Sequence, residues 1–282
     1  MRNIVVLVLA ILLWSVRVFA QLGGSMQIGD VTLGRCYEMK SKVLGEVRKV
    51  NVYLPEGYDA NDTVRYPVVY LLDGGADEDF IHVVGAYQFS SFSWVHWVKP
   101  SIIVGIVNVD RRRDYTFPTK VAEHTAAYPT TGHSAPFIGY LEQELMPWVK
   151  RNYRVNGGRT IIGESLGGLL ATEILLHNPA MFNRYVIISP SLWWNEASLL
   201  KTNWKQWSRK VTRPTEIYIG VGKEGLTPGP NPRVMEVDAN VLYDEIKAVK
   251  NGRVKIKFDY LQDEDHATIG HQAVLNSIKY LK

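Results

Sequence analysis

The sequence predicts one α/β domain, in which helices flank both faces of a single doubly wound, mostly parallel sheet. The first observation is a set of short apolar, β-branched segments, such as 66–72 (YPVVYLL) and 101–109 (SIIVGIVNV). Strands that are buried on both faces of a parallel sheet have this composition. The second is that segments with helical periodicity separate these strands. The third is that no repeat or long linker divides the 282 residues, so one large domain is expected.

The expected elements alternate along the chain. Segment 46–54 (EVRKVNVYL) alternates apolar and polar residues like a half-buried strand, and Pro55 and Gly57 turn the chain after it. Further strands are expected at 66–72, 101–109, 159–163, 185–189, 216–221 and 254–260. Helices are expected at 135–153, 166–177, 232–250 and 267–281. Because ligands of doubly wound sheets bind at the carboxyl ends of the strands, the loops after these strands are the places where functional residues are expected.

Composition excludes several classes of protein. Charged residues make up 21% and the formal net charge is +4, which is too balanced to indicate nucleic-acid binding or electrostatic docking on a membrane. The single cysteine, Cys36, excludes an internal disulfide and a cysteine-based zinc cluster. No HExxH spacing is present, so we expect neither a metal nor a cofactor.

The N-terminus has the pattern of a secretory signal peptide. Arg2 precedes an unbroken apolar run of eleven residues, 4–14, which is too short to span a membrane. Val18 and Ala20 place small residues before a cleavage site, so we expect residues 1–20 to be removed and 21–282 to form the mature domain. The alternative is an uncleaved N-terminal anchor. Cleavage predicts a periplasmic or secreted protein without stable membrane insertion.

A G-x-S-x-G motif, Gly163 to Gly167, lies between an expected strand and an expected helix. This strand–turn–helix context is the one in which the motif presents a nucleophilic serine, here Ser165. Side chains at the two glycine positions would collide with neighbouring elements in so tight a turn. The helix that follows would aim backbone N–H groups at a developing oxyanion. The alternative is a glycine-rich turn in which Ser165 only caps the helix.

A serine hydroxyl needs a positioned base, and His266 is the best candidate among seven histidines. It follows the last expected strand and precedes the final helix, which fits the chain order of nucleophile, acid and histidine on such sheets. The acid is expected after the strand 216–221, where Glu224 lies. Asp238 and Asp263 are rivals, and a Ser165–His266 dyad without an acid also remains open.

Two backbone N–H groups are expected to stabilise the oxyanion. One belongs to Leu166, directly after the nucleophile. The other belongs to Gly75 or a direct neighbour in the glycine-rich loop after the strand 66–72. A plain turn is the alternative for this loop.

Two further loops suggest contacts with substrate. Three adjacent arginines follow the strand 101–109, and Arg112 and Arg113 are candidates for binding an anionic group. Trp193 and Trp194 follow the strand 185–189 and would form an aromatic wall. The alternatives are a solvated loop with paired charges and an aromatic cover over the core.

These residues together resemble a known family. The strings YLLDG (70–74), GESLGG (163–168), ISPSLWW (188–194), VGKE (221–224) and DH (265–266) look like the esterase D-like serine esterases of the α/β-hydrolase fold. The resemblance spans about residues 43–281. It is strongest to bacterial periplasmic esterases of trilactone siderophores, in which the serine and histidine at the positions of Ser165 and His266 are catalytic.

The resemblance implies hydrolysis of ester bonds in catecholate trilactones of the enterobactin or salmochelin type, with a ferric siderophore as one possible substrate form. An arginine facing a polyanionic iron–catecholate would suit this role. Two alternatives remain: an esterase acting on feruloyl or acetyl-xylan esters, and a non-catalytic periplasmic binding protein that retains a hydrolase scaffold.

Overall fold

The computed structural model describes residues 28–227 and 232–281. Residues 28–33 contain neither helix nor strand, and the elements below belong to the unit that begins at Gly34. The expected signal peptide, residues 1–20, lies outside the described residues. Within the described ranges, no helix is both long enough and apolar enough to cross a membrane.

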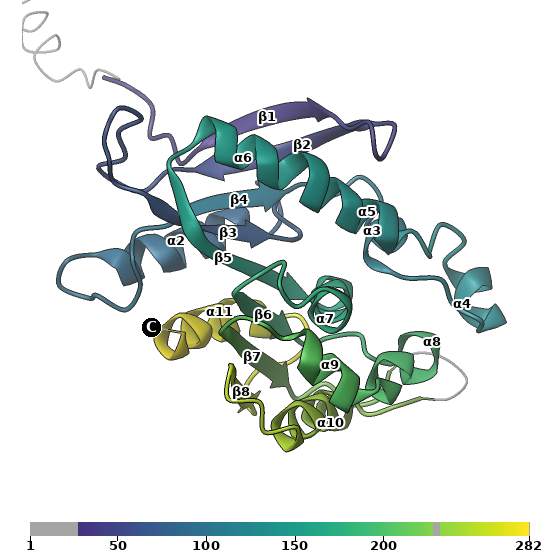
Figure 1. Ribbon diagram of the computed structural model, residues 1–282. Coiled ribbons are helices and arrows are strands. Elements are labelled where there is room, and N and C mark those ends of the chain that lie inside the picture. Colours follow the sequence, from purple (N-terminus) through teal and green to yellow (C-terminus); the bar gives the residue numbers. More distant parts are fainter. Residues whose placement is uncertain (1–27, 228–231, 282) are drawn as a thin grey trace, which may run out of the picture. The chain divides into compact units, whose positions relative to one another are not determined.

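Eight strands form one sheet in the order β1-β2-β4-β3-β5-β6-β7-β8 (Figure 1). The strands are β1 (Arg35–Lys40), β2 (Val47–Tyr53), β3 (Tyr66–Leu71), β4 (Ile102–Ile106), β5 (Val155–Glu164), β6 (Arg184–Ile188), β7 (Thr215–Gly222) and β8 (Val254–Leu261). β2 pairs antiparallel with both β1 and β4, and every other pair is parallel. The predicted doubly wound, mostly parallel sheet is therefore confirmed.

Helices cover both faces of this sheet. They are α2 (Phe80–Ser91), α3 (Arg111–Tyr115), α4 (Ala122–Ala127), α5 (Ser134–Tyr140), α6 (Met146–Asn152), α7 (Leu166–His177), α8 (Trp194–Ala197), α9 (Trp204–Lys210), α10 (Met235–Ala248) and α11 (Ile269–Tyr280). The helices α5, α7 and α10 bury their apolar side chains in one core cluster. The helices α2 and α11 bury theirs in a second cluster.

Most expected elements form within a few residues of their predicted bounds. The helix expected at 166–177 is α7, whereas the one expected at 135–153 is α5 and α6 joined by a π-helical turn, Leu141–Leu145. Strand β1 was not predicted, since it is an edge strand with several exposed residues and lacks a continuous apolar run. The short helices α3, α4, α8 and α9 also lack enough turns to show a period.

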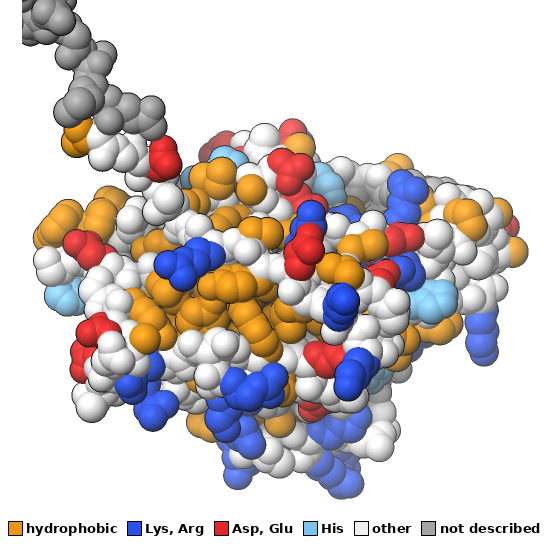
Figure 2. Space-filling view, turned by 90° about the horizontal axis from the view of Figure 1, so that it is seen from above, with side chains coloured by type: hydrophobic (Ala, Val, Ile, Leu, Met, Phe, Trp, Pro, Cys, Tyr) orange, Lys and Arg blue, Asp and Glu red, His pale blue; other side chains and the backbone are white. Residues whose placement is uncertain are grey.

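The edge strand β1 is fixed to the domain by aromatic packing. The ring of Tyr37 on β1 lies 5.2 Å from that of Trp148 on α6, which in turn lies 5.7 Å from that of Tyr153. Figure 2 looks down on the side of the molecule that carries β1 and α6, and hydrophobic side chains gather near its centre. These rings also pack against the core, so the packing holds β1 in place.

Candidate active site

The turn between β5 and α7 is a strained elbow that presents Ser165. Ser165 has φ 57° and ψ −116°, a region that costs an ordinary residue about 1 kcal/mol or more. A Cβ on Gly163 would lie 2.4 Å from the carbonyl oxygen of Gly167, so only glycine fits there. A Cβ on Gly167 would lie 3.2 Å from Oδ2 of Asp73, which is tight. Both glycines therefore have the steric role that the motif predicts.

His266 lies beside this serine. Its Nε2 is 3.0 Å from the Ser165 Oγ, although the two residues are 101 positions apart. The turn after β8 that carries His266 is shaped by Asp265, whose Oδ1 accepts hydrogen bonds from the backbone N–H groups of Ala267 and Thr268. When Nδ1 carries the ring proton, Nε2 is free to accept the serine proton, as a general base requires.

Glu224 completes a hydrogen-bonded chain with His266 and Ser165, here called the relay. Its Oε2 accepts a hydrogen bond from Nδ1 of His266, and its Oε1 accepts one from the hydroxyl of Ser189. The Glu224 side chain is only 1% exposed, whereas that of His266 is 45% exposed. The rival Asp238 is held by Arg233 at 2.6 Å, and the rival Asp263 is exposed. The structure thus brings together Ser165, His266 and Glu224, and the geometry is that of a triad.

Hydrogen bonding tunes the proton affinities within the relay. The hydrogen bond to Glu224 raises the pKa of His266 above its ordinary value, and burial opposes this only in part. Burial alone would raise the pKa of Glu224. Its hydrogen bonds from His266 and Ser189 outweigh burial and hold that pKa below its ordinary value. Glu224 therefore stays ionised and stabilises the imidazolium that forms when the serine is deprotonated.

The loop after β6 contributes two serines that sequence reasoning missed. Ser189, at φ 40°, anchors Glu224. Ser191 is buried, and its Oγ lies 3.3 Å from the Ser165 Oγ. Their position at the carboxyl end of the expected strand 185–189 was the available signal, because that edge of the sheet carries the site.

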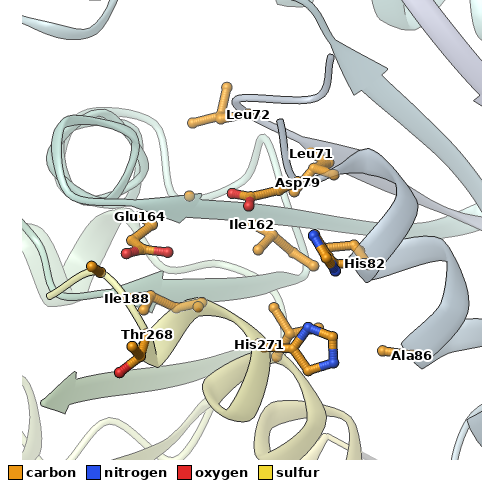
Figure 3. Close-up of a pocket in the computed structure, with 15 residues that line it drawn as sticks. Leu71, Leu72, Asp79, His82, Ala86, Ile162, Glu164, Ile188, Thr268 and His271 are labelled. Atoms are coloured by element: carbon orange, nitrogen blue, oxygen red, sulfur yellow. The ribbon is translucent and has the colours of Figure 1, made fainter. Parts of the chain in front are cut away.

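Glu164, directly before the nucleophile, was also missed. It lines a cavity of about 210 Å³ together with residues from α2 and α11. Figure 3 shows Asp79, His82 and His271 around the same cavity, with the two imidazole rings 5.3 Å apart. Burial, reinforced by the nearby Asp79 carboxylate, raises the pKa of Glu164 to about 7. Its negative charge also favours the charged form of His266.

The two expected oxyanion donors differ in availability. Leu166 begins α7, so its N–H has no partner within the helix. The Gly75 N–H instead donates to Oε2 of Glu78 at 2.7 Å, and Asn108 holds the same carboxylate at 2.6 Å. The neighbouring Gly74 N–H donates to the carbonyl oxygen of Ile106, the last residue of β4, at 2.9 Å. The expectation that Gly75 offers a free donor is corrected, because a carboxylate from its own loop occupies that N–H.

The expected arginine contacts also need correction. Arg113 is bound by Glu46 at 2.6 Å and by Asp114 at 2.8 Å, so it braces the fold instead of facing a ligand. Arg112 is exposed, and its guanidinium lies 4.6 Å from the ring centre of Tyr128.

The first arginine of the run is the one that reaches the site. Arg111 binds Asp73 at 2.6 Å and donates to the Glu164 carbonyl at 3.0 Å. On the short helix α3 successive side chains point in different directions, and the sequence alone did not show which of the three arginines faces the nucleophile.

The two tryptophans have different environments. Trp194 is 1% exposed, and its indole N–H donates to the Phe117 carbonyl at 2.8 Å. The expectation that Trp194 contacts substrate is therefore corrected, because its ring is committed to the core. Trp193 is half-buried and lines a groove with His124.

The described residues contain no cluster of three or more His, Cys, Asp or Glu side chains arranged to hold a metal ion. The strand order, the elbow and the contacts of Ser165, His266 and Glu224 are those of a serine hydrolase with the α/β-hydrolase fold. The family model "Putative esterase" matches residues 41–266, and the chain belongs to this family of carboxylic ester hydrolases.

Three proteins of this kind are similar to the chain over most of its length. The ferri-bacillibactin esterase BesA of Bacillus subtilis is 27% identical over 254 residues, which cover 83% of this chain and 85% of that protein. The crystal structure of the BES protein from Bacillus cereus superposes with a TM-score of 0.78 at 28% identity, covering 92% of this chain and 98% of the other. An IroE-like serine hydrolase from Shewanella oneidensis superposes with a TM-score of 0.77 at 28% identity, covering 88% and 79%.

Proposed function

We propose that this esterase hydrolyses the ester bonds of catecholate trilactone siderophores. The reaction type rests on one observation above all, the contact between the Ser165 hydroxyl and Nε2 of His266 at 3.0 Å. The substrate class rests on the similarity to the ferri-bacillibactin esterase over most of both chains. The alternative of a non-catalytic binding protein is not favoured, since the hydrogen bonds of a working relay are all present.

In the proposed mechanism, Ser165 attacks the ester carbonyl while His266 accepts its proton. The Leu166 N–H stabilises the tetrahedral oxyanion, and Gly75 contributes a second N–H only after Glu78 has moved from it. His266 then protonates the leaving alkoxide, which leaves an acyl group on the Ser165 oxygen. Water, deprotonated by His266, attacks this acyl–enzyme. His266 then returns the proton to the Ser165 oxygen as the bond to the acyl group breaks, which releases the acid and restores the serine hydroxyl.

The substrate is tested with a panel in which products are identified by mass. Iron-free and ferric trilactones, a feruloyl ester and an acetylated xylan oligosaccharide are each incubated with the chain. We expect the trilactone to be opened with a kcat/KM well above those for the two carbohydrate esters. Faster turnover of the feruloyl or acetyl ester would overturn the proposed substrate class, and the iron-free and ferric arms determine which form is preferred.

We also propose that the protein is exported to the periplasm or beyond the cell. The support is the charged start, the apolar run 4–14 and the small residues before position 21. The test is N-terminal sequencing of the protein recovered from a cell fraction. A mature N-terminus at Gln21 supports export with cleavage, whereas an intact Met1 in the membrane fraction would indicate an anchor.

A further inference from the structure

A second hollow, here called the α4 groove, lies beside the candidate active site. It has a volume of about 1010 Å³ and is lined by His124 of α4, by Trp193 and by the turn 195–197. Trp193 on its wall is two residues from Ser191, whose Oγ lies 3.3 Å from the Ser165 Oγ, so this wall begins close to the nucleophile. A groove of this size is at the upper end of what ligand pockets commonly offer, about 300–1,000 Å³.

One wall of the α4 groove is a turn with an unusual backbone. Asn195, Glu196 and Ala197 have φ values of 49°, 53° and 53°, although none of them is glycine. The Asn195 side chain holds the turn, since its Oδ1 accepts from the Lys120 N–H at 2.9 Å and its Nδ2 donates to Ser198 at 3.1 Å. Left-handed conformations of ordinary residues persist only where the surrounding structure enforces them, and they cluster at ligand sites.

The same groove contains a buried aromatic histidine. His124 is 9% exposed; its ring stacks on that of Trp194 at 4.8 Å and meets that of Trp193 edge-on at 5.3 Å. Its Nδ1 is buried and has no hydrogen-bond partner in the described part of the chain, which is unfavourable for folding. The rings of His124 and Trp194 therefore fix the orientation of the Trp193 indole.

The charges around the α4 groove are nearly balanced. Lys120 and Lys201 line it together with Glu123 and Glu196, while the nearby Arg233 is already paired with an aspartate. Burial lowers the pKa of His124 below its ordinary value, so its ring is neutral near pH 7. An aromatic wall with mixed polar groups around it suits a planar, hydroxylated, uncharged ring better than a strong anion.

We infer that the α4 groove is a second subsite, which binds a hydroxylated aryl arm of the substrate while the ester next to another arm is cleaved at Ser165. This inference rests on the proposed function, since a trilactone carries several such arms on one ring. Stacking of the arm on Trp193 holds the lactone so that an ester carbonyl stays at the nucleophile. The groove thus selects multi-armed esters over simple ones.

The test compares two substrates in three variants. The substrates are an iron-free dihydroxybenzoyl trilactone and the methyl ester of one dihydroxybenzoyl-serine arm, and the readout is the ratio of their kcat/KM values. Trp193→Leu keeps an apolar side chain but removes the aromatic face. Lys201→Glu replaces an exposed ammonium group on the groove's lining, which can donate a hydrogen bond to the hydroxyl oxygens of the arm, with a carboxylate that cannot. Trp204→Leu is the matched control, because Trp204 packs edge-on against Trp207 on α9, outside the groove.

We expect Trp193→Leu to lower the ratio by about tenfold, through weaker binding of the trilactone, and Lys201→Glu to lower it by a few-fold. Trp204→Leu should leave the ratio as it is in the wild type. A ratio unchanged in Trp193→Leu and Lys201→Glu would overturn the subsite while leaving the proposed function intact. A wild-type chain that opens no trilactone would instead overturn the proposed function. If Trp193→Leu fails to fold, the ratio of kcat/KM values measured for Lys201→Glu decides whether the α4 groove is a subsite.

Discussion

Two groups of loops meet at the same edge of the sheet but differ in how their side chains are held. The first group follows β5, β6, β7 and β8, and the second group follows β3 and β4. In the first group His266 contacts Ser165 through Nε2 and Glu224 through Nδ1. In the second group the expected groups have other partners: Gly75 is bound by Glu78, and Arg113 by Glu46. The first group therefore supplies the reacting atoms, and the second group shapes and braces the site.

This difference shows which features of the site can be predicted from short sequence patterns. Steric contact fixes Gly163 and the Ser165 elbow within a few residues, and the chain order then points to His266. Long side chains are different, because an arginine reaches whichever carboxylate the fold brings near. Glu46 lies 67 residues before Arg113, and no short pattern in the sequence links them.

The largest expected effect is on the nucleophile. Ser165→Ala should lower turnover of a nitrophenyl ester by about three to six orders of magnitude, because the residual rate would come from binding and the oxyanion donors alone. Steady-state kinetics measure the loss, and circular dichroism checks that the fold is retained. Turnover like that of the wild type in this variant would exclude Ser165 as the nucleophile.

The next effect concerns the acid. Activity requires neutral His266, so kcat/KM should fall as pH drops through the raised pKa of this residue. Glu224→Gln removes the main cause of that raised pKa. We expect kcat/KM to fall by about a hundredfold, and the acidic limb of the pH profile to move to lower pH.

The exposed rival Asp263 provides the control for this profile. Asp263→Asn should leave both the rate and the acidic limb as they are in the wild type. A Glu224→Gln variant with the wild-type profile would support a Ser165–His266 dyad. A shift in Asp263→Asn instead would assign the acid role to that residue.

Ser189 is expected to have a smaller effect. Its hydroxyl anchors Glu224 and contacts no substrate in the proposed mechanism. Ser189→Ala should lower kcat by about three- to tenfold and move the acidic limb, because the Glu224 carboxylate loses a hydrogen bond that keeps it ionised. The pH profile of kcat separates this from a general loss of packing, which would lower the rate without moving the limb.

Arg113 and Arg112 are expected to give the smallest effects, and they test whether the loop after β4 braces the fold. Arg113→Ala should destabilise the fold by about 1–3 kcal/mol, because Asp114 and Glu46 lose a partly buried partner. Arg112→Ala removes only an exposed contact with Tyr128 and should stay within about 0.5 kcal/mol of the wild type. Urea denaturation measures both. Equal stabilities of the two variants would show that Arg113 does not brace the fold.

The most direct test of the central claim is to label the nucleophile with a fluorophosphonate and locate the adduct by peptide mass spectrometry. The buried hydroxyl of Ser191, 3.3 Å from that of Ser165, makes the choice of residue informative. We predict one adduct, on the peptide that contains Ser165, and much slower labelling in His266→Ala. An adduct on Ser191, or labelling at the wild-type rate without His266, would contradict the proposed relay.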